Sequence, residues 1–517
     1  MKKILVLLIL FSYKISFSQL VNPPLDVKSP TASSLGKYGD IPVSHYNGST
    51  NVAIPLYTIN EREIPLEIYL NYDSGGIRVN SVASWVGQNW SLNAGGVITR
   101  SIRDKVDVLN YNFNWGIHNY QYSRKGFKYA GHRLNNTNWS TTNSLTDLVH
   151  ESNLVDTPNP YHNMDLEPDI FTFNFMGITG KFFLDNNGNW RVQSNSKLKI
   201  KTYERVTPNL FQDRFDGTPN EPSSDVRNDI GKIIITDEKG NQYIFGSTND
   251  HIEYSLPIPE TILRAKFIER PSTWYLSSVM NSKGITLYNF EYERVEPIIH
   301  VYRNNSFKIG SCLSENGVAY TITYDRTHGD NFRTTRIYPV YLKNIQTYSG
   351  NRIEFEITNI NKKPFENHFT HDDMEWKKLD QIKIYNYNDK LVRSIGLEYH
   401  TIGNNLRLNL KAIHNNIEAN QIQTMYSFEY DRFNELPNYL SKKIDKWGFY
   451  NGQEYIVRSM NYEGWTWALG QSPPDDHFSE HDSSRASNEN FAIIGMLKKL
   501  SIRLKDLLLL NMKHIEQ

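Results

Sequence analysis

The feature that most constrains this chain is a recurring pattern of short alternating segments joined by tight turns. Each copy has an apolar or aromatic segment, a turn with polar residues or Gly, and a second apolar or aromatic segment. Alternation with a period of two is typical of β-strands, and Asn-Gly, Lys-Gly and Ser-Gly supply the positive φ that tight hairpins need. The pattern therefore predicts successive antiparallel hairpins. Its copies span Ile54–Tyr72, Gly180–Trp190, Ile233–Phe245, Leu276–Tyr292, Leu342–Ile357 and Leu379–Tyr399.

Single hairpins of this kind are only marginally stable in water. Each unit buries its apolar face by pairing with the next, and a sheet that long must curl or close to protect its edges. The 32 Tyr, 24 Phe and 10 Trp suit such half-buried pleated surfaces. We predict an all-β fold: successive antiparallel hairpins forming a large curved sheet or partial β-shell, with long loops and a short helical C-terminal tail. An ordinary multi-domain β-sandwich protein is the alternative.

The N-terminus has the pattern of an export signal. Lys2 and Lys3 precede the apolar run Ile4–Phe11, which is too short to span a bilayer. Ser16 and Ser18 place small residues before a cut ahead of Gln19, so residues 1–18 are predicted to be a signal peptide. The expected location is outside the cell or on its surface, with no membrane span in the mature chain.

Charge and cysteine content narrow the functional classes. Lys+Arg and Asp+Glu both total 56, and a chain without a basic excess is not expected to bind nucleic acid. Cys312 is the single cysteine, which excludes a disulfide within the chain and cysteine-based metal sites.

The remaining sequence divides into segments of different character. We predict a β segment at 19–105, hairpins with long insertions at 106–250, a hairpin meander at 251–499 and an aberrant tail at 500–517. Within these, the polar stretches Asn110–Asn163, Thr207–Asn228 and Trp467–Asn490 are predicted to be long loops.

Several blocks resemble the N-terminal region of bacterial Rhs/YD-repeat secreted proteins. The most specific combines Gly76–Val79 with Ala83–Arg100 (ASWVGQNWSLNAGGVITR), and it is also similar to B components of toxin complexes. The family usually has Leu-Gly where this chain has Gln88 and Asn89. The other matching blocks are Ser29–Ser44, Asn51–Tyr57, Glu167–Phe175, Gly180–Phe182, Asp445–Gly452 and Gly495–Lys499.

The resemblance implies a scaffold with no catalysis of its own. In the family this region precedes long YD repeats that wind into a hollow β-shell, which can enclose a variable C-terminal cargo, often a toxin. The implied partners are downstream Rhs repeats or a toxin cargo. The family's self-cleavage residues lie near the end of the repeat core, so none is carried over to this chain.

The last residues depart from this pattern. Ser501–Gln517 is rich in Leu, Lys and Arg and predicts a short helix. Codons for Ile502–Gln517 can be chosen so that, read from the third base, they encode Pro-Thr-Lys-Gly-Phe-Thr-Thr-Phe-Glu-Tyr-Glu, the hairpin the family has here. Our hypothesis is a frameshift near Leu500 that truncates a family member. The alternative is that codon degeneracy permits such a string by choice.

Three groups of residues have types suited to binding ions. One comprises His368, His371, Asp372, Asp373 and Glu375, and another comprises Asp475, Asp476, His477, Glu480, His481 and Asp482. Both lie in polar stretches without a helical framework, so solvated loops are favoured over zinc sites. The segment Asp185–Asn189 is interpreted as a hairpin turn, because it lacks the Glu that completes an EF-hand. We therefore predict no catalytic, cofactor-binding or metal-ligating residue and no cofactor.

Tryptophans could stack on sugars, although core packing is the commoner role for such residues. The candidates are Trp85, Trp90, Trp190, Trp274 and Trp447. The favoured function is a non-catalytic structural part of a secreted scaffold for surface display or toxin delivery. The alternatives are a secreted carbohydrate-binding protein or adhesin, and an enzyme acting on polysaccharide, which would need two carboxylates facing each other in a cleft.

Overall fold

A computed structural model describes most of the chain between residues 28 and 502. The ranges not described are 1–27, 33–50, 63, 104, 116–119, 136–162, 209, 211–226, 259–268, 305–307, 314–319, 326–330, 367–373, 418–420, 455–484 and 503–517. The predicted signal peptide, residues 1–18, lies outside the described part.

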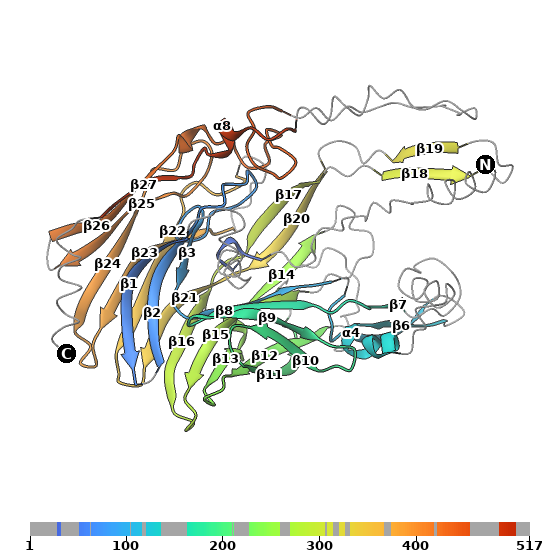
Figure 1. The fold of residues 1–517 in the computed structure, drawn as a ribbon, viewed down its shortest axis with the longest axis horizontal. Coiled ribbons are helices and arrows are strands. Elements are labelled where there is room, and N and C mark those ends of the chain that lie inside the picture. Colours follow the sequence, from blue (N-terminus) through green and yellow to red (C-terminus); the bar gives the residue numbers. More distant parts are fainter. Residues whose placement is uncertain are drawn as a thin grey trace, which may run out of the picture.

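The largest element is one antiparallel sheet, here called the long sheet, in which most hairpins pair with their neighbours along the chain. In Figure 1 it runs from β11 and β12 near the bottom to β26 and β27 at the upper left. Its strands, in spatial order, are β11 (Lys199–Val206), β12 (Asn228–Thr236), β13 (Gln242–Gly246), β15 (Arg270–Met280), β16 (Thr286–Arg294), β21 (Val340–Thr347), β22 (Arg352–Asn359), β23 (Lys377–Tyr385), β24 (Leu391–Tyr399), β25 (Leu410–Ile417), β26 (Gln421–Tyr430) and β27 (Leu497–Ile502).

A second sheet branches from the first because β15 belongs to both. Its C-terminal half pairs with β13 and β16, whereas its N-terminal half pairs with β4 and β14. The strands of this second sheet, in spatial order around β15, are β10 (Trp190–Ser194), β9 (Ile178–Leu184), β8 (Ile170–Phe175), β4 (Gly96–Ser101), then β14 (Ile252–Ile258), β20 (Asn331–Tyr338) and β17 (Ile298–Asn304).

A three-stranded cover sheet packs on the long sheet. It consists of β1 (Asn51–Glu61), β2 (Ile64–Asp73) and β3 (Trp90–Asn93), and Figure 1 shows β1 and β2 lying across β22–β24. In β2, Leu66, Ile68 and Leu70 are buried while the residues between them are more exposed, as a strand with one face on a core requires. One hydrophobic cluster contains side chains from all three sheets, so they share a core.

The remaining elements are small. Two short sheets are formed by β5 (Asn110–Trp115), β6 (Tyr120–Lys125) and β7 (Asn163–Met164), and by β18 (Lys308–Leu313) and β19 (Tyr320–Asp325). The short helices are α4 (Phe127–Ala130), η1 (Gly131–Asn135), η2 (Asn249–His251), η3 (Phe433–Glu435) and α8 (Glu489–Ala492). The predicted all-β architecture of successive antiparallel hairpins is therefore confirmed.

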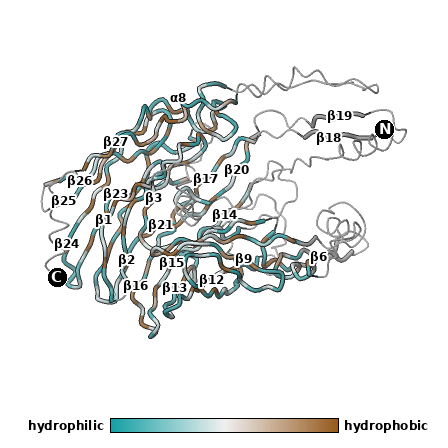
Figure 2. Tube along the Cα trace, in the orientation of Figure 1, coloured by the Kyte–Doolittle hydropathy of each residue, from teal (hydrophilic) through white to brown (hydrophobic). Residues whose placement is uncertain are grey.

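Register shifts bend the long sheet, and alternating side chains give it one buried face. Most ladders of the long sheet contain a register shift, such as those between Tyr203 and Glu204 and between Glu291 and Tyr292. Such bulges bend a strand and increase its twist. Figure 2 shows hydrophobic positions interspersed with hydrophilic ones along the strands, which is the alternation a sheet with a buried face needs.

Several hairpins share one turn, in which an Asp or Asn carboxyl or amide oxygen accepts hydrogen bonds from the backbone two and four residues later. In the β9–β10 turn, Asp185 Oδ1 accepts from the N–H groups of Asn187 and Asn189 at 3.0 and 2.8 Å. Gly188 has a φ of +78°, which a residue without a side chain adopts at no steric cost. The same turn begins at Asp237, Asn281 and Asn386.

Two expectations need correction. The predicted loop Asn110–Asn163 contains β5, β6, α4 and η1, because aromatic residues in this polar stretch alternate as a strand pattern requires. The predicted aberrant tail starts too early: Leu500–Ile502 belong to β27, where Leu500 pairs with Phe428 and Ile502 with Tyr426. The helix predicted for the rest of the tail lies outside the described residues, as do most of Thr207–Asn228 and of Trp467–Asn490.

Candidate functional site

The two clusters that have metal-ligand residue types, and that are interpreted as solvated loops, fall largely outside the described residues. Of the first, only Glu375 is described, and its carboxylate pairs with the Lys377 Nζ at 2.6 Å. The hydrogen bond from Lys377 is the main cause that lowers the pKa of Glu375. The second cluster, Asp475–Asp482, is not described at all. In the part of the chain that is described, no group of three or more His, Cys, Asp or Glu side chains is arranged to hold a metal ion.

The segment Asp185–Asn189 is a hairpin turn, as expected. Both oxygens of the Asp185 carboxylate are engaged, since Oδ1 accepts from backbone N–H groups and Oδ2 accepts from the Arg191 guanidinium at 2.8 Å. The backbone hydrogen bond from Asn189 is the main cause that lowers the pKa of Asp185. The carboxylate therefore serves to close the turn.

The predicted core role is confirmed for most of the tryptophans. Trp85, Trp90 and Trp274 are buried, and Trp190 is partly buried against the same hydrophobic cluster. The prediction is wrong for Trp447, whose side chain is 73% exposed. The reason is that Trp447 lies at the tip of a turn and not in a strand, so no sheet face covers it.

A cavity of about 540 Å³ lies beside the ends of β16 and β20. Its lining is mostly polar and includes Glu293, Arg294, Tyr338, Glu375 and Lys377. Several of these groups already have partners in the protein: Arg294 donates to the carbonyls of Asn249, Ile252 and Tyr338, and Glu375 is paired with Lys377.

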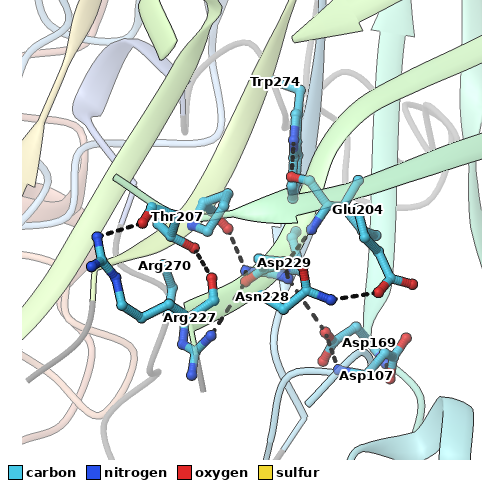
Figure 3. A network of polar contacts seen from close by, with 12 residues as sticks. Asp107, Asp169, Glu204, Thr207, Arg227, Asn228, Asp229, Arg270 and Trp274 are labelled. Carbon is cyan, nitrogen blue, oxygen red and sulfur yellow. Dashed lines mark hydrogen bonds and ion pairs between the residues drawn. The ribbon is translucent and has the colours of Figure 1, made fainter. Parts of the chain in front are cut away.

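Within the described part of the chain, a buried cluster of charged residues lies where β4, β8, β12 and β15 meet. Arg100 in β4 forms a two-pronged ion pair with Asp229 in β12, with Nη1–Oδ1 and Nη2–Oδ2 distances of 2.7 and 3.1 Å. Arg100 Nη2 also donates to the Pro271 carbonyl at 2.5 Å. Figure 3 shows Asp229 at the centre of this network, between Arg270 and the pair Asp107 and Asp169.

Two further carboxyl groups in this cluster each accept a hydrogen bond from the other residue's backbone. The Asp169 N–H donates to Asp107 Oδ1 at 2.9 Å, and the Asp107 N–H donates to Asp169 Oδ2 at 3.2 Å. Burial is the main cause that raises the pKa of Asp107, and the charge of Asp169 raises it further. Burial also raises the pKa of Asp169, against the lowering effect of Arg100. Burial and the neighbouring like charge therefore both favour the protonated form of Asp107.

The composition of the cluster explains why a proton is favoured there. Asp107, Asp169 and Asp229 bring three carboxyl groups, whereas Arg100 and Arg270 bring two guanidinium groups. The Arg100 guanidinium also lies over the Trp274 ring, 5.3 Å from its centroid. Burying unmatched charge is costly, and a carboxyl group reduces that cost by staying protonated.

This arrangement fits a clamp better than a catalytic centre. The side chains of Arg100 and Asp169 are fully buried and that of Asp229 is 1% exposed, so a polymer substrate cannot reach them. What the cluster does is join strands that are distant in sequence, because Arg100 and Asp229 are 129 residues apart.

A second buried carboxyl group holds the N-terminal segment. Glu253 in β14 accepts a hydrogen bond of 2.6 Å from the Ser29 N–H. The neighbouring Ala32 packs with Val97, Tyr275 and Val340. Burial is the main cause that raises the pKa of Glu253 to about 7. The block that begins at Ser29 therefore inserts its first residues into the interior.

A buried arginine holds the Ala83–Arg100 block and the loop before it. Arg407 donates to the carbonyls of Val79 and Ser81 at 2.6 and 3.2 Å. Its guanidinium lies 4.3 Å from the centroid of the Tyr439 ring. The Gln88 N–H donates to the Leu408 carbonyl at 2.8 Å, so the block docks on the segment before β25.

Sequence reasoning did not single out these buried charged residues. One signal was present: Arg100 ends the most specific block, and Asp169 lies in the block Glu167–Phe175. Each stands at a position where strand alternation demands an inward side chain, because Ile98 and Phe171 on the same strands are buried. A charge at an inward position signals a buried partner, although it does not identify the partner.

Within the described residues no helix is long and apolar enough to cross a membrane. No protein-family model and no curated protein matches this chain.

Among solved structures, the chain is similar to TcdB2-TccC3-Cdc42 (12% identity, TM-score 0.34) and to TcdB2-TccC3-TEV (12% identity, TM-score 0.31). Each match covers 75% of this chain, which spans only 16% of the matched chain. It is also similar to the N-terminal domain of effector protein SpvB from Salmonella typhimurium strain LT2, at 13% identity and a TM-score of 0.29. That match covers 71% of this chain and 99% of the other.

Proposed function

We propose that this chain is a non-catalytic scaffold, the N-terminal part of a secreted Rhs/YD-repeat-type protein. The observation that carries the proposal is that the buried charged groups described above bind residues from distant parts of the chain and so hold the sheets in one arrangement. Arg100, Asp229, Glu253 and Arg407 each bind residues from distant parts of the chain. Such ties give a long sheet a fixed curvature, which is what a shell wall needs.

The end of the long sheet supports a role in a larger wall. Within the described residues, β27 pairs with β26 along one side and with no strand along the other. A strand with one free side presents N–H and C=O groups that can pair with a further strand. The charges of β27 do not block this side, since Lys499 pairs with Glu429 and Lys498 with Asp431 on the neighbouring segment.

The proposed partner of this free side is the next hairpin of a YD-repeat region, and the proposed cargo of the complete shell is a C-terminal toxin. The hairpin obtained by reading Ile502–Gln517 from the third base would supply that strand. Sequencing the gene tests this part of the proposal directly. Codons incompatible with the Pro-Thr-Lys-Gly-Phe string would remove the frameshift hypothesis.

Hydrogen exchange tests the scaffold role. The chain is compared alone and as a longer product that carries the restored reading frame and its downstream repeats. We expect the amides of β27 to exchange more slowly in the longer product, while those of the interior strand β23 are unchanged. Equal exchange of β27 in the two proteins would contradict pairing at this edge.

An activity assay tests the non-catalytic part of the proposal. The chain is incubated with soluble acidic and neutral polysaccharides, and new reducing ends are measured. We expect no release above a heat-denatured control. Turnover that is lost on substituting a described carboxylate would overturn the proposal.

A further inference from the structure

Three lysines lie on the outer face of the hairpin formed by β11 and β12, near the bottom of Figure 1. Lys199 and Lys201 in β11 are exposed, and Lys232 in β12 is half-buried. The alternate residues of the same strands, such as Ile200 and Ile233, belong to the shared hydrophobic core. Because side chains alternate between the two faces of a strand, the lysines lie on the face turned away from that core.

Strand pairing gathers two of these charges around one tyrosine. Tyr203 is directly opposite Lys232 and two residues after Lys201, so the three side chains share a face. The Lys201 and Lys232 Nζ atoms lie 4.9 and 4.4 Å from the centroid of the Tyr203 ring. The two ammonium groups are therefore no farther apart than the sum of these distances. The attraction of both cations to the ring keeps two like charges close together.

The lysine-bearing end of the hairpin is bounded by described residues. Lys199 is paired with Thr236, the last residue of β12 before its turn into β13. The undescribed residues 211–226 join the opposite end, where Val206 is paired with Asn228. Five residues separate Lys201 from Val206, which is about 16 Å along a strand.

Lysines elsewhere on the long sheet are paired with carboxylates of a neighbouring strand. Examples are the pairs Lys343–Glu293, Lys383–Glu356 and Lys411–Glu398. Among the ion pairs of the described residues, none includes the three lysines of β11 and β12. This hairpin therefore departs from the charge pairing that the rest of the sheet follows.

The carboxylates of the hairpin and its turn do not offset the lysines. Asp237 accepts the backbone hydrogen bonds that close the turn into β13, and Glu204 pairs with Lys128. Asp229 belongs to the buried cluster around Arg100. Glu238 is exposed at the tip of the turn and forms no ion pair with a described residue. The outer face of this hairpin thus carries cations without carboxylates between them.

Protection of a sheet edge does not explain the whole arrangement. Lysines on an edge strand deter pairing with other chains, which would account for Lys199 and Lys201 because β11 pairs only with β12 among the described strands. Lys232 lies in an interior strand, since β12 pairs with both β11 and β13. Edge protection also does not need a tyrosine that draws two cations together.

We infer that Lys199, Lys201 and Lys232 form a binding surface for a linear acidic polysaccharide, with Tyr203 as a positioning residue. An ammonium group binds a carboxylate or sulfate as a point charge and does not need a planar, two-pronged partner. Lys199 and Lys201 are two residues apart, which is about 6.6 Å along the strand. Charges that repeat along a strand are complementary to a polymer whose charges also repeat.

Two other polyanionic partners fit this surface less well. Single-stranded nucleic acid is bound by aromatic rings on which bases stack, whereas the Tyr203 ring is already in contact with two ammonium groups. Binding in a lipid interface scales with the apolar area that enters it, and Ile234, which lies between the lysines on this face, is half-buried.

The test measures binding of the full chain to polygalacturonate and to dextran sulfate, with neutral dextran, anionic lipid vesicles and a single-stranded oligonucleotide as comparisons. The triple variant Lys199→Gln/Lys201→Gln/Lys232→Gln should weaken binding to the acidic polysaccharides by about tenfold or more. Added salt should weaken binding of the wild type more than binding of this variant.

The matched control removes three lysines that have carboxylate partners on the same sheet. The variant Lys343→Gln/Lys383→Gln/Lys411→Gln changes the net charge by the same amount, and its affinity should stay within about twofold of wild type. Equal losses in the two triple variants would show that net charge alone drives binding, and the inference would fail.

Tyr203 is tested by separating its ring from its hydroxyl. Tyr203→Leu should weaken binding by about threefold, because the two ammonium groups lose the ring that holds them. Tyr203→Phe keeps the ring and should bind as the wild type does. Unchanged binding by Tyr203→Leu would remove the positioning role.

The remaining outcomes also decide the question. Absence of wild-type binding to both acidic polysaccharides, or equal binding to neutral dextran, would overturn the inference. Tighter binding to vesicles or to the oligonucleotide would assign the surface to that partner instead. If the variant without Lys199, Lys201 and Lys232 formed oligomers in size-exclusion chromatography but kept its polysaccharide binding, the lysines would serve to protect the edge. The inference does not rest on the proposed scaffold role.

Discussion

Trp90 and Tyr430 are 340 residues apart in the chain, yet the Trp90 Nε1 donates a hydrogen bond of 2.8 Å to the Tyr430 hydroxyl. The Tyr430 hydroxyl in turn donates to the Leu410 carbonyl at 2.7 Å. The rings of Tyr72 and Phe428 pack on Trp90, with centroid distances of 5.0 and 4.8 Å. This relay joins β3 of the cover sheet to β25 and β26 of the long sheet.

Substitutions at Trp90 and Tyr430 should each lower the free energy of unfolding, and their effects should not be additive, because the two residues share a hydrogen bond. Trp90→Phe removes the donor and leaves the Tyr430 oxygen without it, which should lower the free energy of unfolding by about 1–3 kcal/mol. Tyr430→Phe should have a similar effect, and the double variant should lose less than the sum of the two. Urea unfolding measures all three, with Trp447→Phe as an exposed control. Strict additivity would argue against the relay.

Arg100 should be among the most sensitive residues of the fold. Arg100→Met leaves Asp229 buried without its main partner, which should destabilise the protein by about 3–5 kcal/mol. Arg100→Lys should recover only part of this, because an ammonium group cannot reproduce the two parallel hydrogen bonds. The control is Arg191→Met, whose surface pair with Asp185 should contribute less than about 1 kcal/mol. Equal losses for Arg100→Met and Arg191→Met in denaturant unfolding would contradict the clamp.

The raised pKa of Glu253 should make the free energy of unfolding fall as pH rises. Burial raises its pKa to about 7, above its ordinary value of 4.5, so the folded chain keeps a proton that the unfolded chain has released. This contribution is fully present below pH 4.5 and is lost as pH rises through 7. Within that window Glu253 should lower the free energy of unfolding by about 1.4 kcal/mol per pH unit. Glu253→Gln should remove this share of the slope, while Asp107 and Asp169, whose pKa values burial also raises, keep contributing in the same direction.

Glu398 supplies a control of opposite sign for the pH measurement. Its hydrogen bond with Lys411 is the main cause that lowers its pKa, so its contribution is present above pH 4.5 and is lost at lower pH. Glu398→Gln should therefore leave the slope between pH 5 and about 7 unchanged. If Glu253→Gln and Glu398→Gln gave the same profile as wild type by thermal unfolding, the buried carboxyl would not be protonated in the fold.

Asn89 should tolerate Gly better than Ala. Its φ is +60°, and its Nδ2 donates to the carbonyls of Asp73 and Gly76, both at 3.0 Å. Asn89→Ala loses both hydrogen bonds and keeps a left-handed backbone that costs about 1–2 kcal/mol for a residue with a Cβ. Asn89→Gly loses the hydrogen bonds but relieves the strain, so its melting temperature should lie between those of wild type and Asn89→Ala. The reverse order would contradict this account.

The left-handed backbone of Asn89 lies at a position where the sequence resemblance predicts Gly. A residue without Cβ adopts a positive φ freely. Asn is the side chain that best tolerates this conformation, and here its amide also bonds the loop between β2 and β3. Asn89 therefore supports the turn before Trp90 with its side chain as well as its backbone.

The sequence alone determined the local units. Hairpins such as β12–β13 and β23–β24 were predictable because their signals act over only a few residues. These signals are the alternation of apolar and polar side chains and an Asp or Asn that closes the turn before its left-handed residue. The same reasoning identified Trp90 and Trp274 as core residues, since strand periodicity assigns a face without knowing the partner strand.

Only the tertiary structure decided which units meet. The sharing of β15 by two sheets, the placement of the cover sheet and the pairing of Arg100 with Asp229 depend on contacts between segments more than 100 residues apart. A buried charge reveals at most that a partner exists, because many carboxylates in the chain could serve. The exposure of Trp447 was equally undetermined, because periodicity shows which face of a strand a side chain occupies but not whether a turn lies against other segments or in solvent.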